Sequence, residues 1–202
     1  MAGDPAGYSA ALWKEMVDLG WTGLAVPEEH GGVGEGFLEV CLLFEQLGYA
    51  LVPTPLPVTV ACCALPIARH GTDAQKSEWL DAISRGRIIT CTPPAWDRPA
   101  SAPIATPADS GDGFVIDGEA QFVPYASTAE SILVTAHVDG DGRRAILLDT
   151  DTPGLAIEPS NTIGFDRPCR VTFNGVRAPS DRVLGGNGDP VEAIALYGAA
   201  AT

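Results

Sequence analysis

The spacing of the apolar residues changes once along this chain. Up to Ile83 they recur at intervals of about three or four residues, which is typical of amphipathic helices. From Ile88 onward they form short β-branched runs separated by Gly, Asp and Pro, which is typical of strands and turns. The change falls near Gly86. We therefore predict the α+β class, with an N-terminal all-α domain over residues 1–86 and a middle β domain over residues 87–185.

Four helices are expected in the first domain, over residues 8–19, 36–47, 57–70 and 72–84. The first two should end before Gly20 and Gly48, because glycine is common just past a helix C-terminus. The third is almost uncharged and should be buried, with a kink at Pro66. The fourth begins with a capping box, in which the side chains of Thr72 and Gln75 satisfy free N–H groups.

Turn residues divide the second domain into at least six strands. Asp117-Gly118 predicts a tight hairpin turn of type I′, because this pair tolerates positive φ angles. Residues 139–142 predict a second hairpin. The strands that we expect cover residues 114–116, 119–123, 131–138, 143–148, 155–158 and 170–173, the last of them ended by Asn174-Gly175. This number of strands is enough for a small antiparallel barrel or sandwich.

Helical spacing resumes after the strands, at Pro190, and continues to Thr202 without a capping residue. We expect residues 186–202 to be the start of a truncated C-terminal helical domain. On this interpretation the chain is a fragment of a longer protein.

Charge and cysteine content argue against several classes of function. Among 202 residues, 12 Lys and Arg stand against 26 Asp and Glu, which gives a net charge of −14. We expect no binding to nucleic acid or to anionic membrane surfaces, because both need basic patches. The five cysteines are odd in number and lack a CxxC pair, and no apolar run approaches the roughly 18 residues of a membrane span. We therefore expect a reduced, cytoplasmic protein without a disulfide framework.

The residues alone reveal no complete active site and no metal site. His30, His70 and His137 are far apart in the sequence and show no metal-ligand spacing. The carboxylates of Glu28-Glu29 are adjacent, and neighbours in sequence rarely act on one substrate atom. No serine lies in a GxSxG motif, and the glycines of residues 31–34 do not match the dinucleotide-binding pattern GxGxxG.

Five segments are more specific when they are taken together: Leu19–Gly34, Phe44–Gly48, Arg69–Lys76, Gly113–Glu119 and Asn174–Gly185. In order and spacing they resemble the acyl-CoA dehydrogenase family. The first three are similar to its N-terminal helical domain, and the fourth to a hairpin of its middle β domain. The fifth is similar to the exit from that β domain toward a C-terminal helical bundle. The resemblance extends from about Ala11 to the end of the chain.

The resemblance implies an oligomeric flavoprotein that acts on acyl-CoA thioesters. In this family FAD lies between the β domain and the C-terminal bundle, and a neighbouring subunit completes the site. A glutamate, on the bundle in the commonest members, removes the α-proton of the acyl group, and the β-hydrogen leaves as hydride to the flavin. Because only residues 189–202 correspond to the bundle, we expect no catalytic residue in this chain.

Seven cofactor-binding positions follow from the resemblance, at two strand ends: Pro94, Ala95 and Trp96, then Phe122, Val123, Pro124 and Tyr125. Ala95 and Trp96 replace the family's Thr and Glu, and Pro124 replaces a hydroxyl-bearing residue. Two side-chain hydrogen bonds to FAD are thereby lost, each worth about 0.5–1.5 kcal/mol. Phe122 can still present an aromatic face to the flavin, although a position in the core explains it too, and Tyr125 offers a hydroxyl.

The third helix also has two interpretations. In the family this region lies near the acyl-binding cavity, so that its small and branched residues would line an apolar tail. Ordinary helix packing explains the same residues equally well. They are Val58, Val60, Ala61, Ala64 and Leu65.

Three functions agree with this pattern. The first is an FAD-dependent acyl-CoA dehydrogenase, in which this fragment alone binds flavin poorly. The second is a catalytically silent subunit that keeps the fold and pairs with an active homologue in a hetero-oligomer. The third is a flavin monooxygenase or oxidase on the same fold. Fold alone does not distinguish them.

Overall fold

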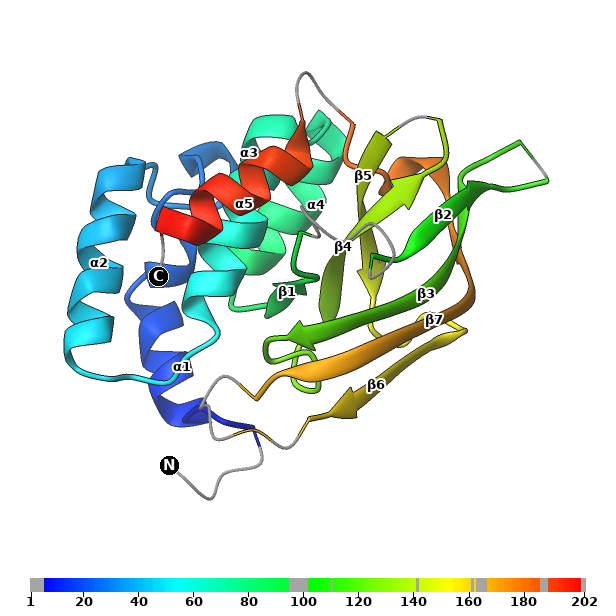
Figure 1. Cartoon of the computed structure of the whole chain (residues 1–202). Coiled ribbons are helices and arrows are strands. Elements are labelled where there is room, and N and C mark those ends of the chain that lie inside the picture. The colour runs from blue at the N-terminus through cyan, green and yellow to red at the C-terminus, as the bar shows by residue number, and fades with distance from the viewer. Residues whose placement is uncertain are drawn as a thin grey trace.

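A computed structural model describes residues 6–94, 102–109, 111–140, 142–160, 162, 167–185 and 189–200. Helices form one side of the molecule and a curled sheet the other (Figure 1). The α-helices are α1 (Ala10–Asp18), α2 (Phe37–Tyr49), α3 (Leu65–His70), α4 (Asp73–Ser84) and α5 (Pro190–Ala200). The π-helical segment η3 (Val58–Ala64) leads directly into α3, and shorter 3₁₀ turns are η1 (Trp21–Gly23), η2 (Glu28–His30) and η5 (Ser180–Arg182).

The sheet is mixed. Its strands are β1 (Ile89–Cys91), β2 (Ile104–Pro107), β3 (Phe114–Val123), β4 (Ser131–Val138), β5 (Gly142–Asp149), β6 (Leu155–Pro159) and β7 (Cys169–Ala178). They follow the order β1-β4-β2-β3-β7-β6, with β5 also paired to β4. Both β1 and β2 run parallel to β4, whereas the other described pairs are antiparallel.

The predicted α+β class, with helices followed by a curled sheet, is confirmed. Only the expectation of an antiparallel sheet needs correction, because two of the described strand pairs are parallel. A parallel pair needs a long crossover, and here the chain passes through β2 and β3 between β1 and β4. Apolar spacing identifies a strand but carries no information about the direction of its partner. The strand β2 was not indicated at all, because it lies in a proline-rich stretch.

Local signals at the helix ends gave mixed results. The capping box is confirmed, since the Gln75 N–H donates to Thr72 Oγ1 (3.3 Å) and the Thr72 N–H to Gln75 Oε1 (3.0 Å). The expected end at Gly48 is wrong, because α2 continues to Tyr49. The left-handed conformation that usually marks a helix end is instead taken by Leu51 (φ 50°).

The expected third helix begins as a π-helix. In η3 the Leu65 N–H donates to the Val60 carbonyl, five residues earlier. Pro66 has no N–H, and in an α-helix its ring would clash with the carbonyl of Cys62. The wider π turn removes this conflict just before α3 begins. Where the sequence predicted a kink at Pro66, the structure has a change from π-helix to α-helix.

The pair Asp117-Gly118 does not form the expected hairpin. The strand β3 runs through it without a break, and the register against β7 shifts there. Gly118 (φ 116°) absorbs this β-bulge, and Asp117 Oδ1 accepts a hydrogen bond from the Gly175 N–H at 2.8 Å. Because Asn174-Gly175 faces the bulge, β7 also continues past its predicted end. The second hairpin is confirmed, with β4 and β5 paired from Ser131↔Asp149 to Val138↔Gly142.

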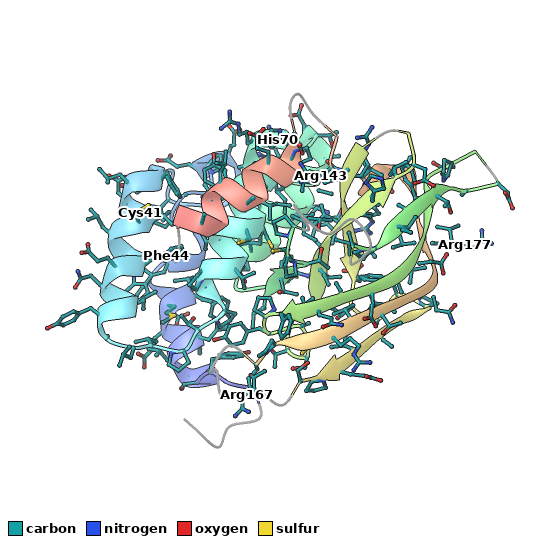
Figure 2. The ribbon with its side chains drawn as sticks, in the orientation of Figure 1. Cys41, Phe44, His70, Arg143, Arg167 and Arg177 are labelled. Atoms are coloured by element: carbon teal, nitrogen blue, oxygen red, sulfur yellow. The ribbon has the colours of Figure 1, made fainter. Side chains whose placement is uncertain are left out.

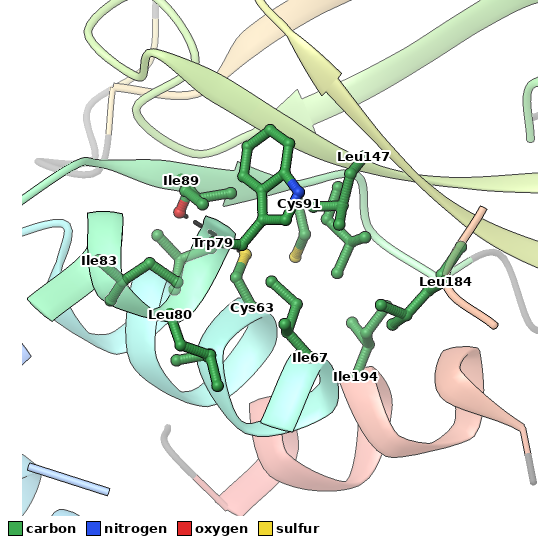
Figure 3. Packing of buried hydrophobic residues seen from close by; sticks show 14 of the residues in the cluster. Cys63, Ile67, Trp79, Leu80, Ile83, Ile89, Cys91, Leu147, Leu184 and Ile194 are labelled. Atoms are coloured by element: carbon green, nitrogen blue, oxygen red, sulfur yellow. Dashed lines mark hydrogen bonds between the residues drawn. The ribbon is translucent and has the colours of Figure 1, made fainter. Parts of the chain in front are cut away.

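The main core lies between the helices and the sheet. Figure 3 shows how its side chains interlock, from η3, α3, α4, α5 and the strands β1 and β5. Trp79 of α4 is buried here, with the guanidinium carbons of Arg87 and Arg182 at 5.0 and 5.1 Å from its ring centroid. A second cluster fills the curl of the sheet. Within the described segments, no helix is both long enough and apolar enough to cross a membrane.

Gln75 connects the helical layer to the segment that follows β7. Its Nε2 donates to the carbonyls of Asp181 and Val183, both at 2.7 Å, while its Oε1 completes the capping box. The side chain is buried, so that water cannot replace these bonds.

We predict that Gln75→Ala lowers the free energy of unfolding by about 2–3 kcal/mol, because two carbonyls and one N–H lose their buried partner. Urea denaturation followed by far-UV circular dichroism measures the change. Gln46→Ala, at an exposed position of α2, is the control and should change stability by less than about 0.5 kcal/mol. Equal effects of the two substitutions would contradict this role of Gln75.

Candidate functional site

An open cavity of about 730 Å³ lies where the sheet meets η3 and α5. Its described lining is mainly apolar and comes from five places in the chain: Val52, Pro53, Thr54, Pro57, Val58, Cys62, Cys91, Pro93, Pro94, Phe122, Pro124, Tyr125, Ile194, Ala195, Gly198 and Ala199. None of these residues is a carboxylate, a histidine or a cation. The described lining can therefore hold an apolar ligand but contains no carboxylate or imidazole that could act as a general base at pH 7.

The structure brings four of the seven predicted positions to this cavity. Pro94, Phe122, Pro124 and Tyr125 line it, although they come from two segments that are far apart in the sequence. Val123 is fully buried in the cluster inside the sheet and does not line the cavity. Ala95 and Trp96 lie outside the described residues.

Of the third-helix residues, only Val58 lines the cavity. The others belong to packing clusters or lie elsewhere on the helix: Val60, Ala61, Ala64 and Leu65. Sequence reasoning missed Cys62, one helical turn after Val58, and the wall supplied by α5. The sequence does indicate the α5 wall through the spacing of Ile194 and Gly198, because residues four apart share one face of a helix.

A strained corner joins β3 to the following turn. Phe122 (φ 58°) and Tyr125 (φ 54°) both adopt the left-handed conformation, which is unusual for aromatic residues. The Tyr125 carbonyl accepts three hydrogen bonds at 3.0 Å, from the N–H and hydroxyl of Thr128 and from the Ala129 N–H. Its ring packs edge-on against Tyr8, with centroids 6.1 Å apart. These contacts hold the backbone strain in place.

Phe122 is 63% exposed, whereas the next residue of β3, Val123, is fully buried. Its interpretation as a core residue is therefore wrong. An exposed aromatic ring on a strained backbone contributes little to folding, and such outliers gather at ligand sites. The corner is the strongest local indication of function in the described residues.

We predict that Phe122→Gly changes the free energy of unfolding by less than about 1 kcal/mol, because relief of strain offsets the added entropy of the unfolded chain. The adjacent substitution Val123→Gly is the control. It empties a buried position and should cost more than about 2 kcal/mol. Urea denaturation of both variants measures the difference, and a loss above 2 kcal/mol for Phe122→Gly would show that its ring packs as core.

Three cysteine thiols lie together at one wall of the cavity. Cys62 and Cys91 line the cavity, and Cys63 lies behind them, with its Sγ 3.6 Å from the Ile89 carbonyl (Figure 3). The hydrogen bond with Cys91, together with burial, raises the pKa of Cys62 far above the usual thiol value, and burial raises the pKa of Cys63. The hydrogen bond with Cys62 lowers the pKa of Cys91. The hydrogen bond with Cys63 and burial raise it by more, so that the pKa of Cys91 is also above the usual thiol value. All three remain neutral thiols at pH 7 and are poor nucleophiles.

These raised pKa values predict a pH dependence of stability. Above the ordinary thiol value of 9.0 the unfolded chain loses protons that the folded chain keeps, so that stability is full below this pH and falls above it. The limit is about 1.4 kcal/mol per pH unit for each thiol. Urea denaturation under reducing conditions between pH 7.5 and 10 should show a shallower fall for Cys62→Ala than for the wild type. Parallel curves would contradict the assignment.

Hydrogen bonds at the first turn of α5 hold the cavity wall that this helix forms. Asp189 Oδ1 accepts from the N–H groups of Val191 (2.9 Å) and Glu192 (3.2 Å). Arg143 of β5 lies beside this turn, 3.4 Å from Asp189 Oδ2 (Figure 2). Further along α5, a Cβ added at Gly198 would lie 3.1 Å from Cys62 Sγ. The absence of a side chain at residue 198 therefore allows α5 to approach η3 closely at the cavity. Among the described residues, no cluster of His, Cys, Asp or Glu could hold a metal ion.

Comparisons with known proteins agree with the fold and with the sequence pattern. The family model "Acyl-CoA dehydrogenase, N-terminal domain" matches residues 3–87. The probable acyl-CoA dehydrogenase YngJ of Bacillus subtilis is 32% identical over 204 residues, which cover 94% of this chain and 53% of that protein. The chain spans about half the length of the curated relatives it matches.

Solved structures are similar over nearly the whole chain. A steroid ACAD variant, Tcur3481-Tcur3483, is 32% identical with a TM-score of 0.83, covering 99% of this chain and 53% of that one. The ChsE4-ChsE5 complex from Mycobacterium tuberculosis is 26% identical with a TM-score of 0.82, covering 96% of this chain and 51% of that one. On this combined evidence of sequence and fold, the chain belongs to the acyl-CoA dehydrogenase family.

Proposed function

We propose that this chain is part of an FAD-dependent acyl-CoA dehydrogenase-like oxidoreductase that removes hydrogen from the α and β carbons of an acyl-CoA thioester. The observation that carries the proposal is the apolar cavity with an exposed Phe122 ring on a strained corner. Family membership supplies the chemical class. When bound, FAD would accept the β-hydrogen as hydride.

The residues present fit the flat, apolar face of such a cofactor. Phe122 offers an aromatic surface, and Pro94, Pro124 and Tyr125 extend the apolar lining around it. They offer less to a polar edge, because Pro94 and Pro124 have no N–H. The Thr54 hydroxyl is already used, since it donates to Met16 Sδ (3.5 Å) and accepts from the Leu56 N–H (3.3 Å). We therefore propose that this chain holds the ring mainly through shape and apolar contact.

The remaining lining would exclude water from the reacting carbons. Val58 and Cys62 on η3, and Ile194 and Ala195 on α5, present apolar surface or a neutral thiol to the cavity. No described lining residue can take the α-proton. We propose that the base, and the rest of the grip on FAD, come from helices outside the described residues or from a neighbouring subunit.

A second candidate is a catalytically silent subunit that pairs with an active homologue. Pro124 favours it, because a proline at this position removes both a hydroxyl and an N–H from the cavity wall. Similar solved structures include the complex of ChsE4 with ChsE5 from Mycobacterium tuberculosis. In either case we propose a homo- or hetero-oligomer of acyl-CoA dehydrogenase-like subunits.

Three further assignments belong to the same proposal. Residues 1–86 and 87–185 would be the helical and β domains, and residues 186–202 the start of a third. The location would be cytoplasmic, which is supported by five free cysteines, since such thiols persist in reducing compartments.

FAD titration of the 202-residue chain tests the proposal. We predict a saturable quenching of flavin fluorescence. The affinity for FAD should be about 2- to 12-fold weaker in Phe122→Ala, because an aromatic contact contributes about 0.5–1.5 kcal/mol. Tyr49→Ala is the matched control, because Tyr49 is 89% exposed on α2 and lies outside the cavity. Equal affinities for Phe122→Ala and wild type would contradict this site.

The two candidates differ in one further measurement. A homologous acyl-CoA dehydrogenase subunit is mixed with this chain, and flavin per subunit is measured in the purified complex. Flavin on both subunits favours the dehydrogenase, whereas flavin on the homologue alone, with none on this chain, favours the silent subunit.

A further inference from the structure

Two proline-bearing segments form one wall of the cavity, and neither can be held in place by its own proline N–H. They are Pro93-Pro94, which follows β1, and the corner Phe122–Tyr125, at the end of β3. Instead, buried threonine hydroxyls donate hydrogen bonds to a carbonyl of each segment. This arrangement is independent of the thiols and of α5.

Thr90 ties down the corner. It is fully buried in the middle of β1, and its hydroxyl donates to the Pro124 carbonyl. The side chains on either side of it, Ile89 and Cys91, point into the core between helices and sheet (Figure 3). Because side chains alternate along a strand, Thr90 points away from that core and toward the corner.

Thr92 and Thr135 hold the other segment, Pro93-Pro94, in place. The Thr92 N–H continues the pairing with β4 by donating to the Leu133 carbonyl at 3.1 Å. The Thr92 hydroxyl accepts from the Thr135 N–H at 2.7 Å, and the two hydroxyls are 2.9 Å apart. Thr135 Oγ1 then lies 3.4 Å from the Pro93 carbonyl and donates to it. Both side chains are buried, so no water competes for these bonds.

Packing alone does not require threonine at these positions. Valine has nearly the same shape and would suit a buried strand as well. A buried hydroxyl is costly unless it is hydrogen-bonded, and here every hydroxyl is bonded to a cavity-wall carbonyl or to another threonine of the set. The corner is strained at Phe122 and Tyr125, and the bond to the Pro124 carbonyl adds to the contacts of Tyr125 that hold it.

We propose that Thr90, Thr92 and Thr135 are positioning residues, which fix the two proline segments so that a planar ligand is gripped by a rigid apolar wall. The inference rests on the proposed function, in which that ligand is the ring system of FAD. The threonines do not touch the ligand. They act through the carbonyls of Pro93 and Pro124.

The first test measures FAD affinity by fluorescence in the full chain. Thr90→Val keeps the shape but removes the bond to Pro124, and should weaken FAD binding by about 3- to 10-fold, as expected for one hydrogen bond. Thr90→Ser keeps the hydroxyl and should restore most of the affinity. Thr22→Val is the matched control, because Thr22 is equally buried and its hydroxyl donates to the Ser84 carbonyl at 3.2 Å, outside the cavity lining.

A double-mutant cycle separates positioning from general loss of stability. If Thr90 acts through the corner, Thr90→Val should lose most of its effect on FAD affinity in a Phe122→Ala background. Additive effects, or an equal loss in Thr22→Val, would overturn the inference.

The second test needs no flavin. Amide hydrogen exchange of residues 122, 123 and 125 should be faster in Thr90→Val than in wild type and unchanged in Thr22→Val. Unchanged exchange in Thr90→Val overturns the inference. Failure of the wild type to bind FAD, with the exchange result intact, counts against FAD as the occupant of this cavity and leaves the positioning role in place, so the two failures can be told apart.

Discussion

The buried strand β1 connects the helical half of the molecule to the β half, and the cavity exists because that connection is rigid. On one side, the Ile89 carbonyl accepts hydrogen bonds from the Thr59 hydroxyl and the Cys63 thiol of η3. On its edge, β1 pairs in parallel with β4 over three residues, from Ile89↔Ser131 to Cys91↔Leu133. A strand this short would be marginal in water. Here hydrogen bonds from η3 and from β4 hold it on two sides, and its side chains are buried.

Signals confined to a few neighbouring residues were sufficient to predict local structure. The capping box at Thr72 and Gln75 and the hairpin between β4 and β5 depend on contacts within one turn, and both are confirmed. Asp117-Gly118 shows the limit of this reasoning. The pair tolerates positive φ in a bulge as well as in a hairpin turn, and only the partner strand β7 decides between them. Strand direction at β1 is equally non-local.

The candidate site was only partly predictable for the same reason. The resemblance pointed to two strand ends, and four of the residues named there meet at one cavity. It could not distinguish Phe122 from Val123, because a left-handed backbone at an aromatic residue reverses the ordinary alternation of faces. The wall made by η3 and α5 depends on how two helices pack, to which Gly198 contributes by its missing side chain. No short sequence motif specifies the distance between η3 and α5.

The backbone at Phe122 has an evolutionary consequence. Mutation and selection for stability alone would replace an exposed, strained phenylalanine with glycine or asparagine, since nothing in the fold requires a large side chain there. Its persistence in a lineage would report continuing selection on the occupant of the cavity. A descendant that had drifted out of use would be expected to lose this aromatic ring before it lost the fold.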